Sequence, residues 1–201
     1  MAQIDYYMIT LSPFCYLAGD KLEKISKKHG AKITYKPVNL FQVFAATGGV
    51  VPADRHPARQ AYRRQEITRV AKARGLPINL TPAFFPSNPA PSCYSAIAAQ
   101  NAGGGDVGGG GGPCQSFLRA CWTEEKDVAE DAIVRACLKE NGFDPGLADS
   151  GMLSGAEIFE KNTQEAIKKG IFGAPMYLVE DQLFSGQDRL CYLDNYLAEQ
   201  N

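Results

Sequence analysis

The tetrapeptide Ser12-Pro13-Phe14-Cys15 is the part of this sequence whose residue types are best suited to chemistry. It follows an apolar segment over residues 4–11 whose aromatic and β-branched side chains are typical of a buried strand. Ser is a favoured N-cap and Pro a favoured first helical residue, so a helix is predicted to begin at Pro13. The first turn of a helix favours anions and lowers the pKa of a thiol bound there. We therefore expect an anion, such as a thiolate, to bind beside the Ser12 hydroxyl.

A second candidate position is Pro175, which follows Gly173-Ala174 and precedes a strand-like segment over residues 176–180. A proline at the first residue of a strand is compatible with a cis peptide bond, which exposes the neighbouring backbone N–H and C=O groups. Because trans is the commoner isomer of X–Pro bonds, the residues alone leave the isomer open.

The cysteines supply no recognisable redox or metal motif. No two of them form a C-x-x-C pair, so both the dithiol motif and the standard zinc spacings are absent from the sequence. Cys15 has no partner cysteine at position 12, and we interpret it as a buried structural thiol. We interpret the other five as small core residues: Cys93, Cys114, Cys121, Cys137 and Cys191. His29 and His56 lack partners at useful spacing, so neither a metal site nor a catalytic histidine is predicted.

The elements that must position these residues form two β-rich ends around a helical middle. The first end is a strand over 4–11, a helix from Pro13 to His29, and a parallel strand over 32–38. The last end is a helix over 154–169, strands over 176–180 and 183–184, and an amphipathic helix over 189–197 with Leu190, Leu193 and Leu197 on one face. Ser154 and Glu157 form a capping-box pattern. The middle is predicted to hold helices over 58–74, 91–101, 114–122 and 127–141.

Composition narrows the class of protein. The chain has 201 residues with 21 basic and 22 acidic side chains, so no net field attracts it to nucleic acid or an anionic membrane. No segment approaches the roughly 20 apolar residues of a membrane helix, and no signal peptide is evident, which together with unpaired cysteines predicts a cytoplasmic protein. The basic helix over 58–74 is interpreted as a solvated face. Because no strand precedes Gly103–Gly112 and no GK[ST] follows, this run is interpreted as a flexible loop and not a phosphate cradle.

The order of elements, with S-P-x-C at the first helix and G-x-P before the third strand, resembles the DsbA-like branch of the thioredoxin superfamily. Within that branch the sequence is most similar to 2-hydroxychromene-2-carboxylate isomerases and the related kappa-class glutathione transferases. The matching segments are residues 5–7, 11–17, 59–62, 75–77, 170–175 and 184–190. The resemblance implies an α/β fold, with a discontinuous thioredoxin-like domain over 1–45 plus 165–201 and an inserted all-helical domain over 46–164.

The resemblance also implies roles for individual residues. Ser12 would be catalytic, donating a hydrogen bond that keeps the thiol of bound glutathione ionised. Ala174, cis to Pro175, would pair with the cysteinyl part of glutathione, and Gln187 with Asp188 would hold its γ-glutamyl end. The implied glutathione-binding residues are Ser12, Phe14, Arg59, Ala174, Pro175, Gln187 and Asp188. Arg59 replaces a lysine of the family and would face the glycyl carboxylate or the substrate's own, and Gly49 replaces an asparagine near the thiol. An aromatic pocket is expected from Phe14, Tyr16, Phe84 and Phe85.

The implied activity is a glutathione-dependent cis-trans isomerisation. The glutathione thiolate would add to the conjugated double bond of 2-hydroxychromene-2-carboxylate, a cyclic hemiketal, and give a ring-opened adduct that can rotate about a bond now single. Elimination of the thiol would then give trans-o-hydroxybenzylidenepyruvate. The expected partner is a small aromatic carboxylate, and a homodimer is possible for the family. Two alternatives remain open from the sequence: a kappa-like transferase that consumes glutathione, and a thioredoxin-fold oxidoreductase or binding protein.

Overall fold

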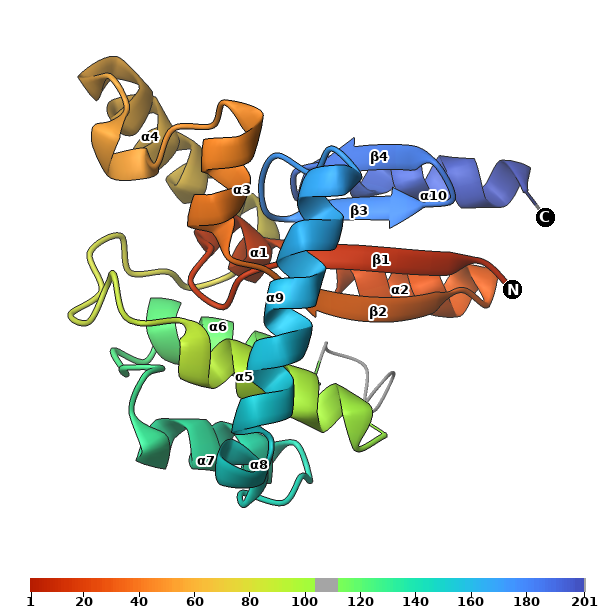
Figure 1. The fold of residues 1–201 in the computed structure, drawn as a ribbon. Helices are drawn as coiled ribbons and strands as arrows, with labels where there is room; N and C mark the ends of the chain where they lie inside the picture. The colour runs from red at the N-terminus through yellow and green to blue at the C-terminus, as the bar shows by residue number, and fades with distance from the viewer. Residues whose placement is uncertain (104–111, 201) are drawn as a thin grey trace.

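A four-stranded mixed sheet forms the centre of the computed structural model, which describes residues 1–103 and 112–200 (Figure 1). The strand order is β2-β1-β3-β4, with β1 (Gln3–Met8) parallel to β2 (Lys32–Pro37). Strands β3 (Met176–Val179) and β4 (Gln182–Ser185) run antiparallel to each other, and β3 pairs antiparallel with β1. This is the thioredoxin-like sheet that the sequence predicts. The interpretation of the Gly103–Gly112 run as a loop concerns residues that, apart from the two at its ends, lie outside the described part.

The connection between β1 and β2 is helical, as predicted, but it is not one helix. Helix α1 (Pro13–Ala18) ends at Gly19, and α2 (Lys21–His29) follows after Asp20. Gly19 adopts φ 58° and ψ −141°, which takes the backbone out of the helix, and its N–H donates to the Tyr16 carbonyl. The prediction of a continuous helix over 13–29 was therefore wrong at this one glycine.

The C-terminal end of the chain contains α9 (Met152–Lys168) and α10 (Leu190–Glu199). Leu190, Leu193 and Leu197 are buried on one face of α10, as predicted. The predicted capping box at Ser154 is wrong, because α9 begins at Met152 and the Ser154 hydroxyl instead donates to the Gly151 carbonyl.

Close packing explains where α9 begins. A Cβ on Gly151 would lie 2.3 Å from that of Ala98, and one on Gly155 would lie 2.8 Å from that of Tyr94. Both neighbours belong to α5 (Ala90–Asn101), so the two glycines let α9 approach α5 at backbone distance. Tertiary contact therefore sets this end of the helix and overrides the local capping signal.

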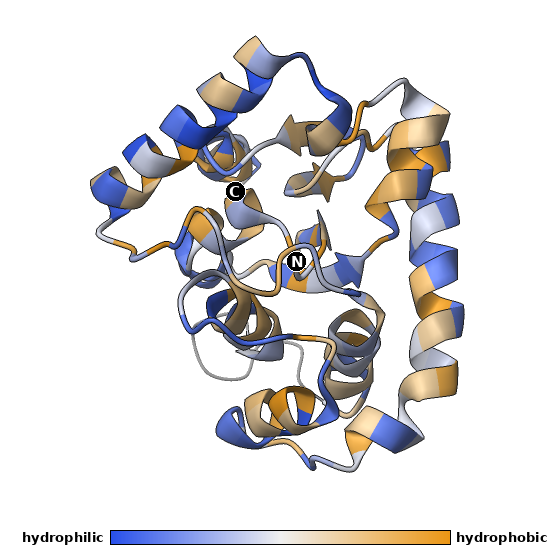
Figure 2. Cartoon of the chain, turned by 90° about the vertical axis from the view of Figure 1, so that its left-hand side faces the viewer, coloured by the Kyte–Doolittle hydropathy of each residue, from blue (hydrophilic) through white to orange (hydrophobic). Residues whose placement is uncertain are grey.

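The middle of the chain is helical, as predicted. It contains α3 (Leu40–Thr47), the short 3-10 turn η1 (Pro52–Asp54), α4 (Pro57–Arg74), α5, α6 (Gly112–Trp122), α7 (Asp131–Glu140) and α8 (Leu147–Ser150). The sequence analysis missed α3, η1 and α8, and it placed the start of α7 four residues early. Figure 2, which views the left side of Figure 1, shows α4 as a long and mostly hydrophilic helix. The proposed domain boundaries at 45/46 and 164/165 fall inside α3 and α9, and they stay predictions.

The hydrophobic core covers both faces of the sheet. The larger cluster packs α1, α2, α6 and α10 against one face, and a smaller one, with Tyr7, Ile171 and Met176, packs under α3 and α9. All six cysteines are free thiols, and five of them are buried, four in the larger cluster and Cys93 in a third cluster with Ile9, Ile97 and Phe159. The exception is Cys191, whose predicted place in the core is wrong because the buried face of α10 is occupied by Leu190, Leu193 and Leu197.

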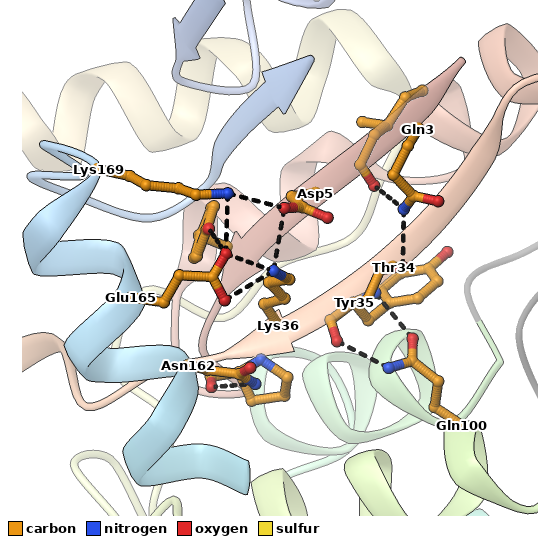
Figure 3. A network of polar contacts seen from close by, with 12 residues as sticks. Gln3, Asp5, Thr34, Tyr35, Lys36, Gln100, Asn162, Glu165 and Lys169 are labelled. Atoms are coloured by element: carbon orange, nitrogen blue, oxygen red, sulfur yellow. Dashed lines mark hydrogen bonds and ion pairs between the residues drawn. The ribbon is translucent and has the colours of Figure 1, made fainter. Parts of the chain in front are cut away.

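A charged network ties α9 to the sheet (Figure 3). The Lys36 ammonium on β2 lies 2.9 Å from the Asp5 carboxylate and 2.8 Å from that of Glu165 on α9. Lys169 also forms an ion pair with Glu165, at 2.9 Å, and the Tyr7 hydroxyl donates a hydrogen bond of 3.2 Å to the Glu165 carboxylate. Burial acts to raise the pKa of Glu165, but the hydrogen bonds from Lys36 and Lys169 outweigh it and lower the pKa to about 2. Ionised Glu165 is therefore part of what holds α9 in place.

Two kinds of site are missing from the residues that can be described. Over 1–103 and 112–200, no helix has both the length and the apolar composition that crossing a bilayer requires. In the same ranges, no three His, Cys, Asp or Glu side chains come together as metal ligands would.

Candidate active site

Ser12 is the N-cap of α1, as the sequence predicts. Its backbone is extended, with φ −82° and ψ 121°, and its Oγ accepts a hydrogen bond of 3.2 Å from the Cys15 amide. The same hydroxyl donates to the Ala174 carbonyl over 3.3 Å. The capping role uses Ser12 as an acceptor and leaves its single proton pointing towards the loop before β3.

The loop before β3 lies against Ser12 although the two are 162 positions apart in the chain. The Ala174–Pro175 peptide bond is cis, the isomer that the family resemblance implied and that the residues alone left open. The Pro175 carbonyl accepts a hydrogen bond of 2.9 Å from the Gly186 amide, so the end of β4 is also held beside Ser12. Within the described residues, no acceptor is found for the Ala174 N–H. Its backbone therefore offers an edge to an extended ligand.

A cavity of about 290 Å³ opens in front of Ser12, Ala174 and Pro175. Its walls are mainly apolar and include α1 with the loop before it, α3, the loop around the cis Phe85–Pro86 bond, and the loop before β3. The side chains of Phe14, Leu40, Phe44 and Phe85 line it. At its mouth Phe41 and Phe172 are exposed. The arrangement suits a small flat ligand with an apolar body.

Two arginines make one wall of the cavity cationic. The guanidinium of Arg55 lies 5.8 Å from the Phe44 ring centre, and its Nε donates to the Val50 carbonyl over 2.8 Å. The guanidinium of Arg63 lies 5.8 Å from the Phe14 ring centre. Neither is paired with a carboxylate from any described residue. The cavity therefore combines an apolar body with positive charge that the protein leaves uncompensated.

Neither arginine was predicted to belong to the site. The basic helix over 58–74, which contains Arg63, was interpreted as a solvated face, and Arg55 lies just before it. Part of the signal was present in the spacing: Arg59 and Arg63 are four residues apart and lie on one side of α4, whereas Arg55 is in extended backbone just before that helix. Helix α3 was not predicted either, and with it Leu40 and Phe44.

The structure brings together four of the predicted glutathione-binding residues. Ser12, Phe14, Ala174 and Pro175 all line the cavity. The other three lie beside it. Arg59 is exposed and lines an adjoining hollow, Gln187 is buried with its carbonyl bonded to Arg74, and Asp188 is exposed and paired with Arg189. Gly186, which precedes Gln187 and Asp188, does reach the cavity wall.

The predicted aromatic pocket is half correct. Phe14 and Phe85 line the cavity, whereas Phe84 is half-exposed outside its lining. Tyr16 is buried, and its hydroxyl donates to the Pro77 carbonyl over 2.7 Å. Its placement in the pocket was wrong because it lies on the core side of α1.

Cys15 is fully buried behind Ser12. Burial raises the pKa of this thiol, and hydrogen bonds from Ser12, the Ile9 backbone and Tyr6 offset only part of that effect. A thiol that is both shielded from solvent and reluctant to ionise has the properties of the structural residue that we expected.

The departure at Gly49 has a structural counterpart. A Cβ at this position would lie 2.5 Å from Cδ1 of Phe44, whose ring lines the cavity. Any side chain at 49, including asparagine, therefore requires Phe44 to move.

The strand-to-helix loop that carries Ser12 is supported from behind by α5. The Thr10 and Ser92 hydroxyls share a hydrogen bond of 2.7 Å, and the Cys93 thiol lies 3.3 Å from Thr10. All three side chains are buried. These contacts hold the loop that carries Ser12 against α5.

Comparison with known proteins identifies a family and several relatives that this chain resembles over nearly its whole length. A family model described as a DSBA-like thioredoxin domain matches residues 3–198. The 2-hydroxychromene-2-carboxylate isomerase of Sphingobium xenophagum is 30% identical over 98% of each chain, and that of Pseudomonas putida is 28% identical over 97% of this chain and 94% of its own. A solved 2-hydroxychromene-2-carboxylate isomerase is similar with a TM-score of 0.78 and 25% identity, over 98% of this chain and 95% of that one. A probable DsbA oxidoreductase from Streptomyces coelicolor shares the fold, with a TM-score of 0.73 at 14% identity over 99% of this chain and 89% of its own.

Proposed function

The chain belongs to the DSBA-like thioredoxin family and, within it, to the 2-hydroxychromene-2-carboxylate isomerases, and from that premise we propose a glutathione-dependent isomerase acting on 2-hydroxychromene-2-carboxylate. The product would be trans-o-hydroxybenzylidenepyruvate. The observation that carries the proposal is the Ser12 hydroxyl beside cis-Pro175, facing an apolar cavity with two uncompensated arginines. A cytoplasmic location, where glutathione is kept reduced, is part of the proposal.

The residues around Ser12 suit the parts of glutathione. The Ala174 N–H and C=O are placed to pair with the cysteinyl backbone, as the edge of a strand pairs with a peptide. Gly186 reaches the same cavity, so the γ-glutamyl end would lie towards Gln187 and Asp188. At the other side, Arg55 and Arg63 suit carboxylates, because a guanidinium can donate two parallel hydrogen bonds to one.

Glutathione would supply a thiol that adds to the conjugated double bond of the substrate and leaves again, so it is not consumed. Ser12 would stabilise the ionised thiol by turning its proton from the Ala174 carbonyl to the sulfur. Its present hydrogen bond is long, at 3.3 Å, so little is lost by this exchange. The Cys15 amide continues to hold Oγ in place because it binds the oxygen and not the proton.

The rest of the cavity would bind and orient the substrate. Arg55 or Arg63 would hold its carboxylate, and Phe14, Phe44 and Phe85 would enclose its ring. Apolar walls exclude water, which strengthens the hydrogen bond of Ser12 and the attraction of the arginines.

The direct experiment follows the ultraviolet spectrum of the chromene acid in the presence of far less glutathione than substrate. Complete conversion with the thiol recovered supports the isomerase. Conversion that stops after one equivalent of glutathione identifies a transferase, and conversion that needs no thiol removes glutathione from the proposal. A rise in melting temperature at millimolar glutathione reports binding independently of turnover.

A further inference from the structure

A second hollow, of about 400 Å³, adjoins the Ser12 cavity on the side of α4. The two share three lining residues: Phe14, Arg55 and Arg63. Arg59 and Tyr62 line the second hollow without lining the first. A ligand bound against Ser12 can therefore extend past the Phe14 ring into a space surrounded by three guanidinium groups.

This positive charge is not balanced by the protein. Glu66 is the acidic residue in the lining of the hollow, and it forms an ion pair with Arg69, outside that lining. None of the described carboxylates pairs with Arg55, Arg59 or Arg63. The three arginines also oppose one another, since burial and the charge of Arg59 lower the pKa of Arg55, and burial and the charge of Arg55 lower that of Arg63.

Such a cluster costs the folded chain stability, because Arg59 and Arg63 are like charges one turn apart on α4 and Arg55, just before the helix, adds a third to the same hollow. Two of its members are nevertheless held in place. Arg55 is anchored through Nε to the Val50 carbonyl, and Arg63 lies over the Phe14 ring. Fixed, uncompensated guanidinium groups around a hollow are arranged as an anion-binding site, since a bound anion would remove their repulsion.

The number of arginines indicates what binds. Of the three carboxylates that the proposed function brings, the γ-glutamyl one would lie towards Gln187 and Asp188, which leaves that of the substrate and the glycyl carboxylate of glutathione for Arg55 and Arg63. Arg59 then faces the second hollow without an anion. Resting on the proposed function, we propose that this hollow is a second carboxylate-binding subsite and that the enzyme prefers chromene carboxylates with a second acid group on the ring, which extends past Phe14 to Arg59.

The test compares two stable ring analogues that cannot turn over, chromone-2-carboxylate and chromone-2,6-dicarboxylate. Their dissociation constants are measured by calorimetry at equal ionic strength, with and without saturating glutathione. The wild-type chain should bind the dicarboxylate at least about tenfold more tightly, the range expected for one charge-assisted hydrogen bond. Arg59→Gln should reduce that ratio to below about threefold. The matched control is Arg64→Gln, on the same helix but in neither lining, which should keep the ratio of the wild type.

Three results would overturn the subsite. One is equal affinity of the wild type for both analogues, and another is an affinity ratio that Arg59→Gln leaves unchanged. The third is that Arg59→Gln weakens the binding of glutathione but not that of γ-glutamylcysteine, which lacks the glycyl residue. The hollow would then hold the glycyl carboxylate. The subsite is tested by the binding of analogues, whereas the proposed isomerisation is tested by turnover of the chromene acid. A failure of the isomerisation alone would therefore appear as absence of turnover in a protein that still binds the dicarboxylate analogue more tightly.

Discussion

Replacing Glu165 by glutamine should destabilise the protein in a way that depends on pH. The carboxylate of Glu165 joins α9 to β2 through Lys36 and is 27% exposed. Its pKa is lowered from 4.5 to about 2. At about 1.4 kcal/mol per pH unit, this difference corresponds to about 3 kcal/mol of folding stability. Because the pKa is depressed in the folded state, this stability is present above about pH 5 and is lost as the pH falls towards 2.

The assay is urea denaturation of the wild type and Glu165→Gln at pH 7 and pH 3. We expect the variant to be about 3 kcal/mol less stable at pH 7, with the difference shrinking to less than half at pH 3, because there the carboxylate of the unfolded chain binds a proton while that of the folded chain stays mostly ionised. Glu157→Gln is the matched control, an exposed position on the same helix, and it should change little at either pH. Equal stabilities at pH 7, or a difference that pH does not alter, would refute the reasoning.

Three further predictions concern the cavity. Gly49→Ala should destabilise the fold by about 1–3 kcal/mol and raise KM for substrate, because its Cβ displaces the Phe44 ring into the cavity; thermal melting and steady-state kinetics measure the two effects, and an unchanged KM would contradict it. Arg63→Gln should lower kcat/KM about 10- to 100-fold for the carboxylate substrate but much less for its methyl ester. An equal loss on both would argue against a contact between Arg63 and the carboxylate of the substrate. Thr10→Val should cost about 1–3 kcal/mol in urea denaturation, because it removes the buried hydroxyl that bonds both Ser92 and Cys93 and leaves Ser92 with only the Pro89 carbonyl; a neutral effect would show that these bonds do not support the loop.

Features decided by neighbouring residues were predictable from the sequence. The strand before Ser12, its capping of α1 and the apolar face of α10 each depend on a few consecutive side chains whose preferences agree. The arrangement of both ends of the chain around one sheet followed from the order of elements and the resemblance, and the structure has that arrangement.

Features decided by tertiary contact were not predictable in the same way. Gly151 and Gly155 fix the start of α9 only because α5 lies against them, whereas Ser154 and Glu157 gave a persuasive local signal for another start. Tyr16 and Phe14 are two residues apart on α1 and equally aromatic, yet the core takes the first and the cavity the second.

The cationic wall shows the same limit in the site itself. Arg55 and Arg63 belong to a run of basic residues whose composition fits a solvated helix. Only the position of α4 beside α1 turns one side of that run towards Ser12. Arg59, which the resemblance implied, lines the adjoining hollow, whereas Arg55 and Arg63, four residues away on either side in the sequence, line the cavity.

The account depends on Ser12 holding the glutathione sulfur as a thiolate, and the most direct measurement is the pKa of the bound thiol. It is obtained by titrating the ultraviolet absorbance of the thiolate in the wild type, in Ser12→Ala, and in Ser185→Ala, which removes another hydroxyl from the cavity wall. The account predicts a thiol pKa well below that of free glutathione in the wild type and in Ser185→Ala. In Ser12→Ala it should rise by about 1–2 pH units, as expected for the loss of one charge-assisted hydrogen bond. A bound thiol with the pKa of free glutathione, or one that Ser12→Ala leaves unchanged, would contradict it.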